Sequence, residues 1–183
     1  MKFWTLASVS WKKKIMNKEN YLYSPWRIDY VLGEKPGDCV MCRAADEDHD
    51  QDNLIIHRGK RCYIMLNRYP YNNAHLMIVP FAHLNSISDL DKETWRELCA
   101  LIPICERAYH ESYHVDGINV GINLGSAAGA GIAEHLHVHM VPRWQGDSNF
   151  MSVVAGVRVI PEAFEESCSK LKSAIEQQIK QDA

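Results

Sequence analysis

The stretch that decides the fold is His135-Leu136-His137-Val138-His139, in which imidazoles alternate with aliphatic side chains. Successive side chains of a β-strand point to opposite faces of the sheet, so the three histidines are expected to share one face. The chain has nine histidines in 183 residues, and three in strict alternation are not expected by chance. The bland alternative is a half-buried strand with incidental polar residues. We predict a strand over 134–142 whose polar face carries chemistry.

Imidazole chemistry favours a nucleophilic role for this row. Histidine is a good neutral nucleophile near pH 7, and a hydrogen bond to one ring nitrogen holds it in a chosen tautomer. Neighbouring imidazoles can also donate protons to phosphate oxygens. A metal ion bound by all three histidines is the competing interpretation, but ligands two residues apart on a flat strand diverge.

A segment rich in small residues, 121–132, lies directly before the histidines and contains Gly121, Gly125, Gly129 and Gly131. Small residues let backbone N–H groups approach an anion closely, as in a phosphate nest. Taken alone, the segment fits a flexible hairpin loop equally well. Its position before the histidine row favours a phosphate site.

Other segments with strand periodicity are 61–67, 74–79 and 117–123, and the first two are expected to form an antiparallel hairpin. Two amphipathic helices are also predicted. The first is capped by Ser88 or Asp89, is kinked at Pro103, and has a buried stripe of Trp95, Leu98, Ile102, Cys105 and Tyr109. The second begins near Pro161, with a stripe that packs in the core or at a dimer interface: Phe164, Cys168, Leu171, Ile175 and Ile179. The sequence therefore predicts one α+β domain with an antiparallel sheet.

The composition and net charge exclude some classes of function. With 46% hydrophobic and 23% charged residues, the chain has the make-up of a soluble globular domain. A formal charge of −3 argues against a nucleic-acid partner, which normally requires a basic face. No run approaches the roughly 18–20 apolar residues of a membrane span, so no membrane partner is expected. Residues 1–20 are expected to be a disordered N-terminal extension, and 21–183 the domain.

The six cysteines mostly stand alone in apolar company, which favours a reduced, cytoplasmic protein. Cys39 and Cys42 are the exception, because their spacing lets two thiolates bind one ion. That spacing is shared by zinc sites, redox pairs and coincidences. A redox pair normally opens a helix that follows a strand, and the turn at 36–38 does not clearly provide that setting.

Residues 135–141 resemble the histidine triad (HIT) motif, in which three histidines alternate with apolar residues. The flanks are similar to the bacterial branch of diadenosine tetraphosphate phosphorylases and hydrolases, in the segments 66–72, 75–80, 129–132 and 142–151. The resemblance spans about 24–161. It implies a HIT-like fold, with a five-stranded antiparallel sheet, a long helix and a C-terminal helix, and it implies a homodimer.

The resemblance also implies a mechanism. His137 would attack the α-phosphorus, and water or inorganic phosphate would release the nucleotide from a nucleotidyl-histidine intermediate. His139 would contact the phosphate oxygens or the leaving group, and His135 completes the catalytic set. The residues implied to bind or support substrate are Asn67, His75, Asn123, Gly129, Ala130, Gly131, Ile132, His139 and Trp144, with Ile28 beside Trp144 on weaker grounds.

Zinc-bearing relatives complete a structural Cys₂His₂ site at positions matching Cys39, Cys42, His83 and His135, and no catalytic metal is expected. The activity implied is cleavage of dinucleoside polyphosphates such as diadenosine tetraphosphate, with phosphorolysis and hydrolysis both open. The alternatives are a nucleoside phosphoramidase and a non-catalytic nucleotide-binding signalling module.

Overall fold

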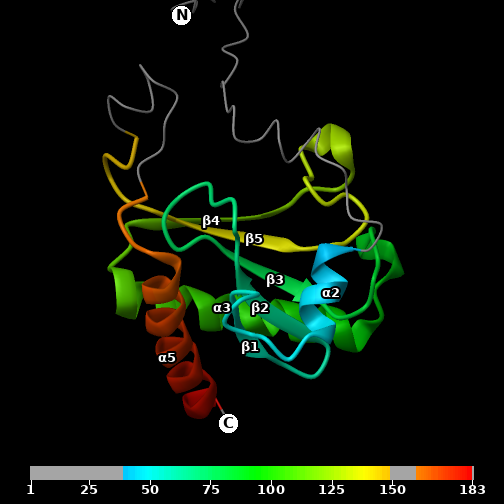
Figure 1. Cartoon of the computed structure of the whole chain (residues 1–183), viewed down its shortest axis with the longest axis horizontal. Coiled ribbons are helices and arrows are strands. Elements are labelled where there is room, and N and C mark those ends of the chain that lie inside the picture. The colour runs from blue at the N-terminus through cyan, green and yellow to red at the C-terminus, as the bar shows by residue number, and fades with distance from the viewer. Residues whose placement is uncertain (1–38, 149–159, 183) are drawn as a thin grey trace, which may run out of the picture.

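A computed structural model describes residues 39–148 and 160–182 and contains a five-stranded antiparallel sheet (Figure 1). The strand order is β1-β2-β3-β5-β4. The strands are β1 Ile55–Arg58, β2 Cys62–Leu66, β3 Leu76–Pro80, β4 Gly117–Ile122 and β5 Val138–Arg143. The predicted α+β fold is confirmed. The predictions for residues 1–20 and for Ile28 lie outside the described residues.

Three strands, β2, β3 and β4, form where the alternation predicts them. The sequence of strand β1 does not show the alternation that predicts a strand. Its register against β2 is irregular between Ile55 and His57. A break of that kind shifts the side chains out of strict alternation.

Strand β5 begins at Val138, so the predicted start at residue 134 is wrong. Its ladder with β3 ends at the pair Ile78–Val138. Two positions further along β3 stands Pro80, which has no N–H to donate to a ladder. The amide of Leu136 donates instead to the carbonyl of Leu84, in the segment after β3. His135 and His137 therefore lie in an irregular lead-in, and only His139 is within the strand.

The helices are α2 Val40–Asp46, α3 Lys92–Tyr113 and α5 Phe164–Asp182, with short 3₁₀ turns η1 Ile87–Asp89 and η2 Ser126–Ala128. The predicted cap of α3 is wrong by two to three residues. Asp91 is the cap, and its carboxylate accepts from the amide of Thr94 at 2.9 Å, because η1 occupies the preceding turn. Helix α3 runs through Pro103 without interruption.

The stripe on α3 was predicted partly wrongly. Trp95 is 38% exposed, and the buried positions include Thr94, Leu101 and Ile104 in addition to the predicted Leu98, Cys105 and Tyr109. On α5, Leu171 and Ile175 are fully buried in the main core. This confirms that the α5 stripe packs within the chain. Within the described ranges, no helix is both long and apolar enough to cross a membrane.

The sheet separates two apolar clusters. Helices α3 and α5 cover one face, where they pack on Ile64, Ile78 and Met140. Helix α2 lies against the opposite face, where Met41 and Ala44 pack with a second cluster (Figure 1). Because neighbouring strand residues alternate between faces, His75 and His139 project toward the α2 side, away from α3.

Candidate active site and metal centre

His137 is 4% exposed and is fixed by a hydrogen bond to its own chain. Its Nδ1 lies 2.8 Å from the carbonyl oxygen of His135. A carbonyl only accepts, so Nδ1 carries the proton and Nε2 of the neutral ring keeps its lone pair. Burial lowers the pKa of His137, which favours this neutral form. The lead-in to β5 therefore presents a nucleophilic nitrogen.

His139 is held in the opposite tautomer by a chain of hydrogen bonds. The amide of Tyr71 donates to Nδ1 of His75 at 3.0 Å, so the proton of His75 is on Nε2. That Nε2 lies 3.0 Å from Nδ1 of His139, to which it donates. The proton of neutral His139 is consequently on Nε2. His137 and His139 thus form a pair with complementary protonation, and their ring centroids are 4.6 Å apart.

His75 itself stays neutral. It is fully buried, and burial, followed by the neighbouring His139 and His137, lowers its pKa to about 3. A neutral ring can relay the direction of a hydrogen bond without adding charge. His75 thus contacts His139, and its support of the triad in catalysis stays a prediction.

Asn67 and Asn123 lie near the histidines in different ways. The Asn67 amide nitrogen lies 3.3 Å from Nδ1 of His75, and its oxygen accepts from the amide of Tyr69 at 2.9 Å. Asn123 follows β4 by one residue beyond the pair Ile122–Val138, which brings it level with His137. Their contact with substrate stays a prediction.

The predicted phosphate loop is exposed and contains a turn of its own. The amides of Gly129 and Ala130 donate to the carbonyls of Ser126 and Gly125, and Gly129 has the left-handed φ of 86° that favours glycine. These two amides already donate within the loop. Phosphate binding by the loop stays a prediction, and the backbone amides of Gly131 and Ile132 are the better candidates for it. Trp144 contacts Tyr113, and its indole N–H donates to the Tyr113 carbonyl at 3.1 Å; its contact with substrate stays a prediction.

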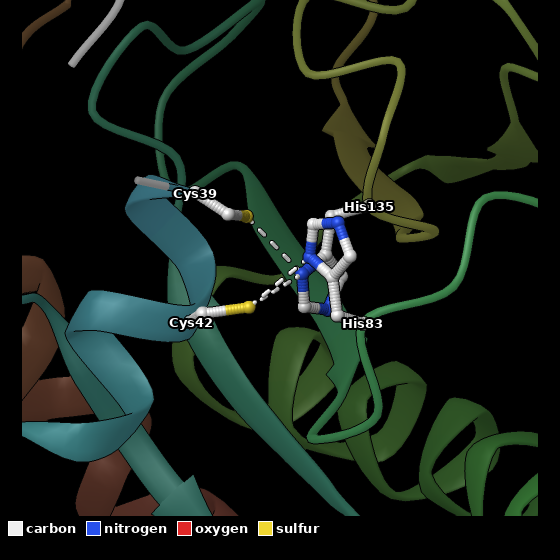
Figure 2. Close-up of side chains that lie close together, drawn as sticks. All are labelled: Cys39, Cys42, His83 and His135. Carbon is white, nitrogen blue, oxygen red and sulfur yellow. Dashed lines mark hydrogen bonds between the residues drawn. The ribbon is translucent and has the colours of Figure 1, made fainter. Parts of the chain in front are cut away.

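Four predicted metal ligands converge on the other side of His135. The ligand atoms of Cys39, Cys42, His83 and His135 all lie within 4.8 Å of one another. Figure 2 shows the sulfurs of Cys39, at the N-cap of α2, and of Cys42, within α2, facing the two imidazoles. Nδ1 of His135 lies 3.3 Å from Sγ of Cys39 and 3.5 Å from Sγ of Cys42, and Nδ1 of His83 lies 3.2 Å from Sγ of Cys42.

These separations fit a tetrahedral ion. Zinc bonds of about 2.3 Å to sulfur and about 2.0–2.1 Å to nitrogen place adjacent ligand atoms about 3.5 Å apart. The tautomer fits as well, because Nε2 of His135 donates to the carbonyl of Pro80 at 2.9 Å and leaves Nδ1 unprotonated toward the sulfurs. One ring nitrogen of His135 thus faces Pro80 and the other faces the sulfurs, and His135 accepts the hydrogen bond from His137 through its backbone carbonyl. A direct catalytic role for the His135 ring stays a prediction.

The helix that carries the cysteines is fixed to the sheet independently of any ion. The Arg58 guanidinium donates to the carbonyls of Ala44, Ala45 and Glu47 at the end of α2. The Tyr63 hydroxyl donates to the carbonyl of Met41 at 2.9 Å. Cys39 caps α2, so the pair does open a helix, and the segment before it, where a redox pair would need a strand, lies outside the described residues. Burial nevertheless raises the pKa of Cys42 to about 11, unlike a reactive redox thiol.

One structural element of the site escaped the sequence analysis. The buried side chain of Asn72 donates to Pro142 O and to the Asp147 carboxylate, both at 2.9 Å. Asp147 also forms a two-point ion pair with Arg143, with distances of 2.7 and 2.9 Å. The segment after β5 is thereby tied to the loop between β2 and β3, which carries Asn67.

Replacing Asp147 with asparagine is expected to lower the free energy of unfolding by roughly 1–3 kcal/mol at neutral pH, because charged hydrogen bonds are lost. The Arg143 guanidinium, with help from the Trp144 amide and Asn72, holds the pKa of Asp147 well below its ordinary value. A depressed folded pKa stabilises the protein above the unfolded pKa of about 4, and this stability is lost as the pH falls through the folded value. Urea unfolding from pH 7 downward measures it.

The wild type should lose stability more steeply than D147N below about pH 4. The matched control is Asp48→Asn, because Asp48 is exposed in the loop after α2. Equal pH slopes for the wild type and D147N would show that this carboxylate does not hold the two segments.

The HIT domain model matches residues 48–146. The chain belongs to the HIT family. It is 43% identical over 155 residues to "AP-4-A phosphorylase" of Mycobacterium tuberculosis, across 80% of this chain and 79% of that protein. The crystal structure of a zinc-bound histidine triad family protein from Mycobacterium smegmatis superposes with a TM-score of 0.63 at 29% identity, covering 80% of this chain and 98% of that one.

A Plasmodium falciparum diadenosine triphosphate hydrolase shares the fold, with a TM-score of 0.55 at 21% identity over 68% of this chain and 77% of its own. The recognition made from the triad is therefore confirmed. The matched HIT region includes His83 and His135 but begins after Cys39 and Cys42. The metal-compatible cluster consequently joins the HIT domain to the segment that precedes it.

Proposed function

We propose that this HIT protein cleaves dinucleoside polyphosphates, such as diadenosine tetraphosphate, through a nucleotidyl-histidine intermediate on His137. The observation that carries the proposal is the complementary protonation of two adjacent buried imidazoles, with a lone pair on Nε2 of His137 and a proton on Nε2 of His139. The mycobacterial relative named AP-4-A phosphorylase supports the substrate class.

In the first step, Nε2 of His137 attacks the α-phosphorus. A P–N bond forms while the P–O bond to the departing nucleotide breaks. The Nε2–H of His139 donates a hydrogen bond to the departing phosphate oxygen, which leaves as an anion, and the hydrogen bond from His75 keeps that N–H directed at the oxygen. In the second step, an oxygen of water or inorganic phosphate attacks the same phosphorus and loses its proton to solvent, while the P–N bond breaks and its electron pair returns to Nε2 of His137, which releases the nucleotide. In-line transfer of this kind depends mainly on positioning and charge stabilisation.

Three further assignments, a metal ion, an oligomeric state and a location, complete the proposal. Cys39, Cys42, His83 and His135 hold a structural zinc ion, supported by the donor geometry and by the zinc-bound mycobacterial neighbour. The protein is a homodimer in the cytoplasm. Strand β4 lies at the edge of the sheet with Val120 48% exposed, and all six cysteines are free thiols. Sedimentation equilibrium tests the dimer.

Incubation with diadenosine tetraphosphate, with and without inorganic phosphate, is the decisive experiment. ADP and ATP that appear only with phosphate identify a phosphorylase, and AMP and ATP without phosphate identify a hydrolase. We expect turnover in one of these two modes. Cleavage of a nucleoside phosphoramidate alone would contradict the substrate class, and nucleotide binding without turnover of any substrate would contradict the enzyme and favour a signalling module.

A further inference from the structure

Tyr109 of α3 places its hydroxyl between two strands of the sheet. The side chain is fully buried, and its oxygen accepts from the amide of Leu76 at 3.1 Å. The hydroxyl proton faces two carbonyls, those of Ala74 and Met140, each at 2.8 Å. Because Leu76 and Met140 are paired residues of β3 and β5, the phenol bridges the two strands at the end of their ladder.

The bridge lies one residue away from each member of the His75–His139 pair. Ala74 and Leu76 flank His75, and Met140 follows His139. Neighbouring strand residues point to opposite faces, so the phenol approaches from the α3 side while the two imidazoles meet on the other side. Tyr109 therefore fixes the backbones that carry both rings without touching either ring.

Ala74 adds a second reason for a fixed backbone at this point. Its φ is 56°, a left-handed conformation that is uncommon for a residue with a Cβ. The Tyr109 hydroxyl is hydrogen-bonded to the carbonyl of this residue, directly before His75. A conformation of this kind persists only where surrounding contacts determine it.

We propose that Tyr109 is a positioning residue, whose bridge between β3 and β5 sets the contact of His75 Nε2 with His139 Nδ1 and so keeps the His139 proton on Nε2. The catalytic consequence rests on the proposed function, in which that N–H donates a hydrogen bond to the leaving group. The structural consequence, the tautomer of His139, does not depend on any substrate.

Tyr109→Phe is the test, because it removes the oxygen and retains the ring. The expected result is a decrease in kcat for diadenosine tetraphosphate of about 10- to 100-fold, the scale of a misplaced catalytic group, with KM within about threefold. In ¹⁵N-histidine NMR spectra of the resting protein, His139 should change from a single Nε2-protonated tautomer to a mixture. Tyr113→Phe is the matched control, since it removes a phenol oxygen one turn later on α3 that bonds to Glu162.

A folded Tyr109→Phe protein with wild-type kcat and an unchanged His139 tautomer would overturn the proposal. If Tyr109→Phe does not fold, p-aminophenylalanine at position 109 retains a donor for both carbonyls and should preserve the tautomer; a folded protein of that kind with mixed tautomers would also overturn it. If the wild type does not cleave diadenosine tetraphosphate, the proposed function fails, while the NMR comparison still decides the role of Tyr109.

Discussion

Replacing His137 with asparagine is expected to reduce the turnover of diadenosine tetraphosphate by about 10⁴-fold or more, the scale measured when a covalent nucleophile is removed. The asparagine amide can still donate to the carbonyl of His135, where Nδ1 of His137 now does so. The side-chain volume and the local hydrogen bond are thus largely kept, and the nucleophilic nitrogen is lost. The unfolding midpoint should change by a few degrees at most.

Two measurements separate the nucleophile from a structural role. Wild-type enzyme quenched in denaturant at alkaline pH, where the P–N bond is stable, should contain a fraction of chains whose mass has increased by one nucleotidyl group, whereas H137N should contain none. Nucleotide binding by H137N should persist, because the residues proposed to bind the phosphates, Asn123, Gly131 and Ile132, are unchanged. Substantial residual turnover by folded H137N would contradict the assignment of His137 and direct the search to another nucleophile.

His114→Asn is the matched control for this replacement. His114 ends α3 with a φ of 46°, in the left-handed region where asparagine is well tolerated. It is the same chemical change at a histidine outside the site. Wild-type turnover of His114→Asn would show that the loss in H137N is specific to its position.

The sequence predicts the sheet and the histidine row well, because both depend on local alternation. Strands β2, β3 and β4 have clear alternating or apolar runs, and the structure confirms them. The start of β5 is not local. It depends on Pro80, which stands across the sheet and interrupts the ladder, so the sequence of β5 alone cannot show where pairing ends.

In the site, too, features encoded locally were predictable and features that depend on distant partners were not. The cysteine spacing and the resemblance to zinc-bearing relatives name the four residues that the structure brings together. Asp147 and Tyr109 were not recognised as site elements, because each acts through partners far away in the chain. Asp147 bonds to Asn72, and Tyr109 bonds to Ala74 and Met140. A buried tyrosine in a helical stripe looks like ordinary core, and only the structure shows where its hydroxyl lies.

The role assigned to His135 differs most between the sequence analysis and the structure. The alternation of His135 with His137 suggests a shared catalytic face, yet its ring faces the cysteines and its carbonyl accepts a hydrogen bond from His137, the proposed nucleophile. One residue therefore links the metal-compatible cluster to the proposed chemistry. The integrity of that cluster should matter both for stability and for the orientation of His137.

Removal of the proposed zinc ion is accordingly expected to lower the thermal stability of the protein strongly. Protein purified without chelator should contain about one zinc ion per chain, and Cys42→Ser should contain little. Zinc at 1,000 times its dissociation constant stabilises the folded state by about 4 kcal/mol. For a chain of this size that corresponds to a change of about 10 °C in Tm. Metal analysis and thermal unfolding, before and after chelation, measure both quantities.

The control and the competing interpretation can be tested in the same series. Cys99→Ser replaces an exposed cysteine on α3 and should retain both zinc content and Tm. In the wild type, re-addition of zinc after chelation should restore the Tm, whereas Cys42→Ser should not respond. Helix α2 is docked by Arg58 and Tyr63, so the chelated protein should stay folded at room temperature and the metal effect should be reversible. A metal-free wild type that forms a Cys39–Cys42 disulfide on oxidation, with no response to zinc, would instead establish a redox pair.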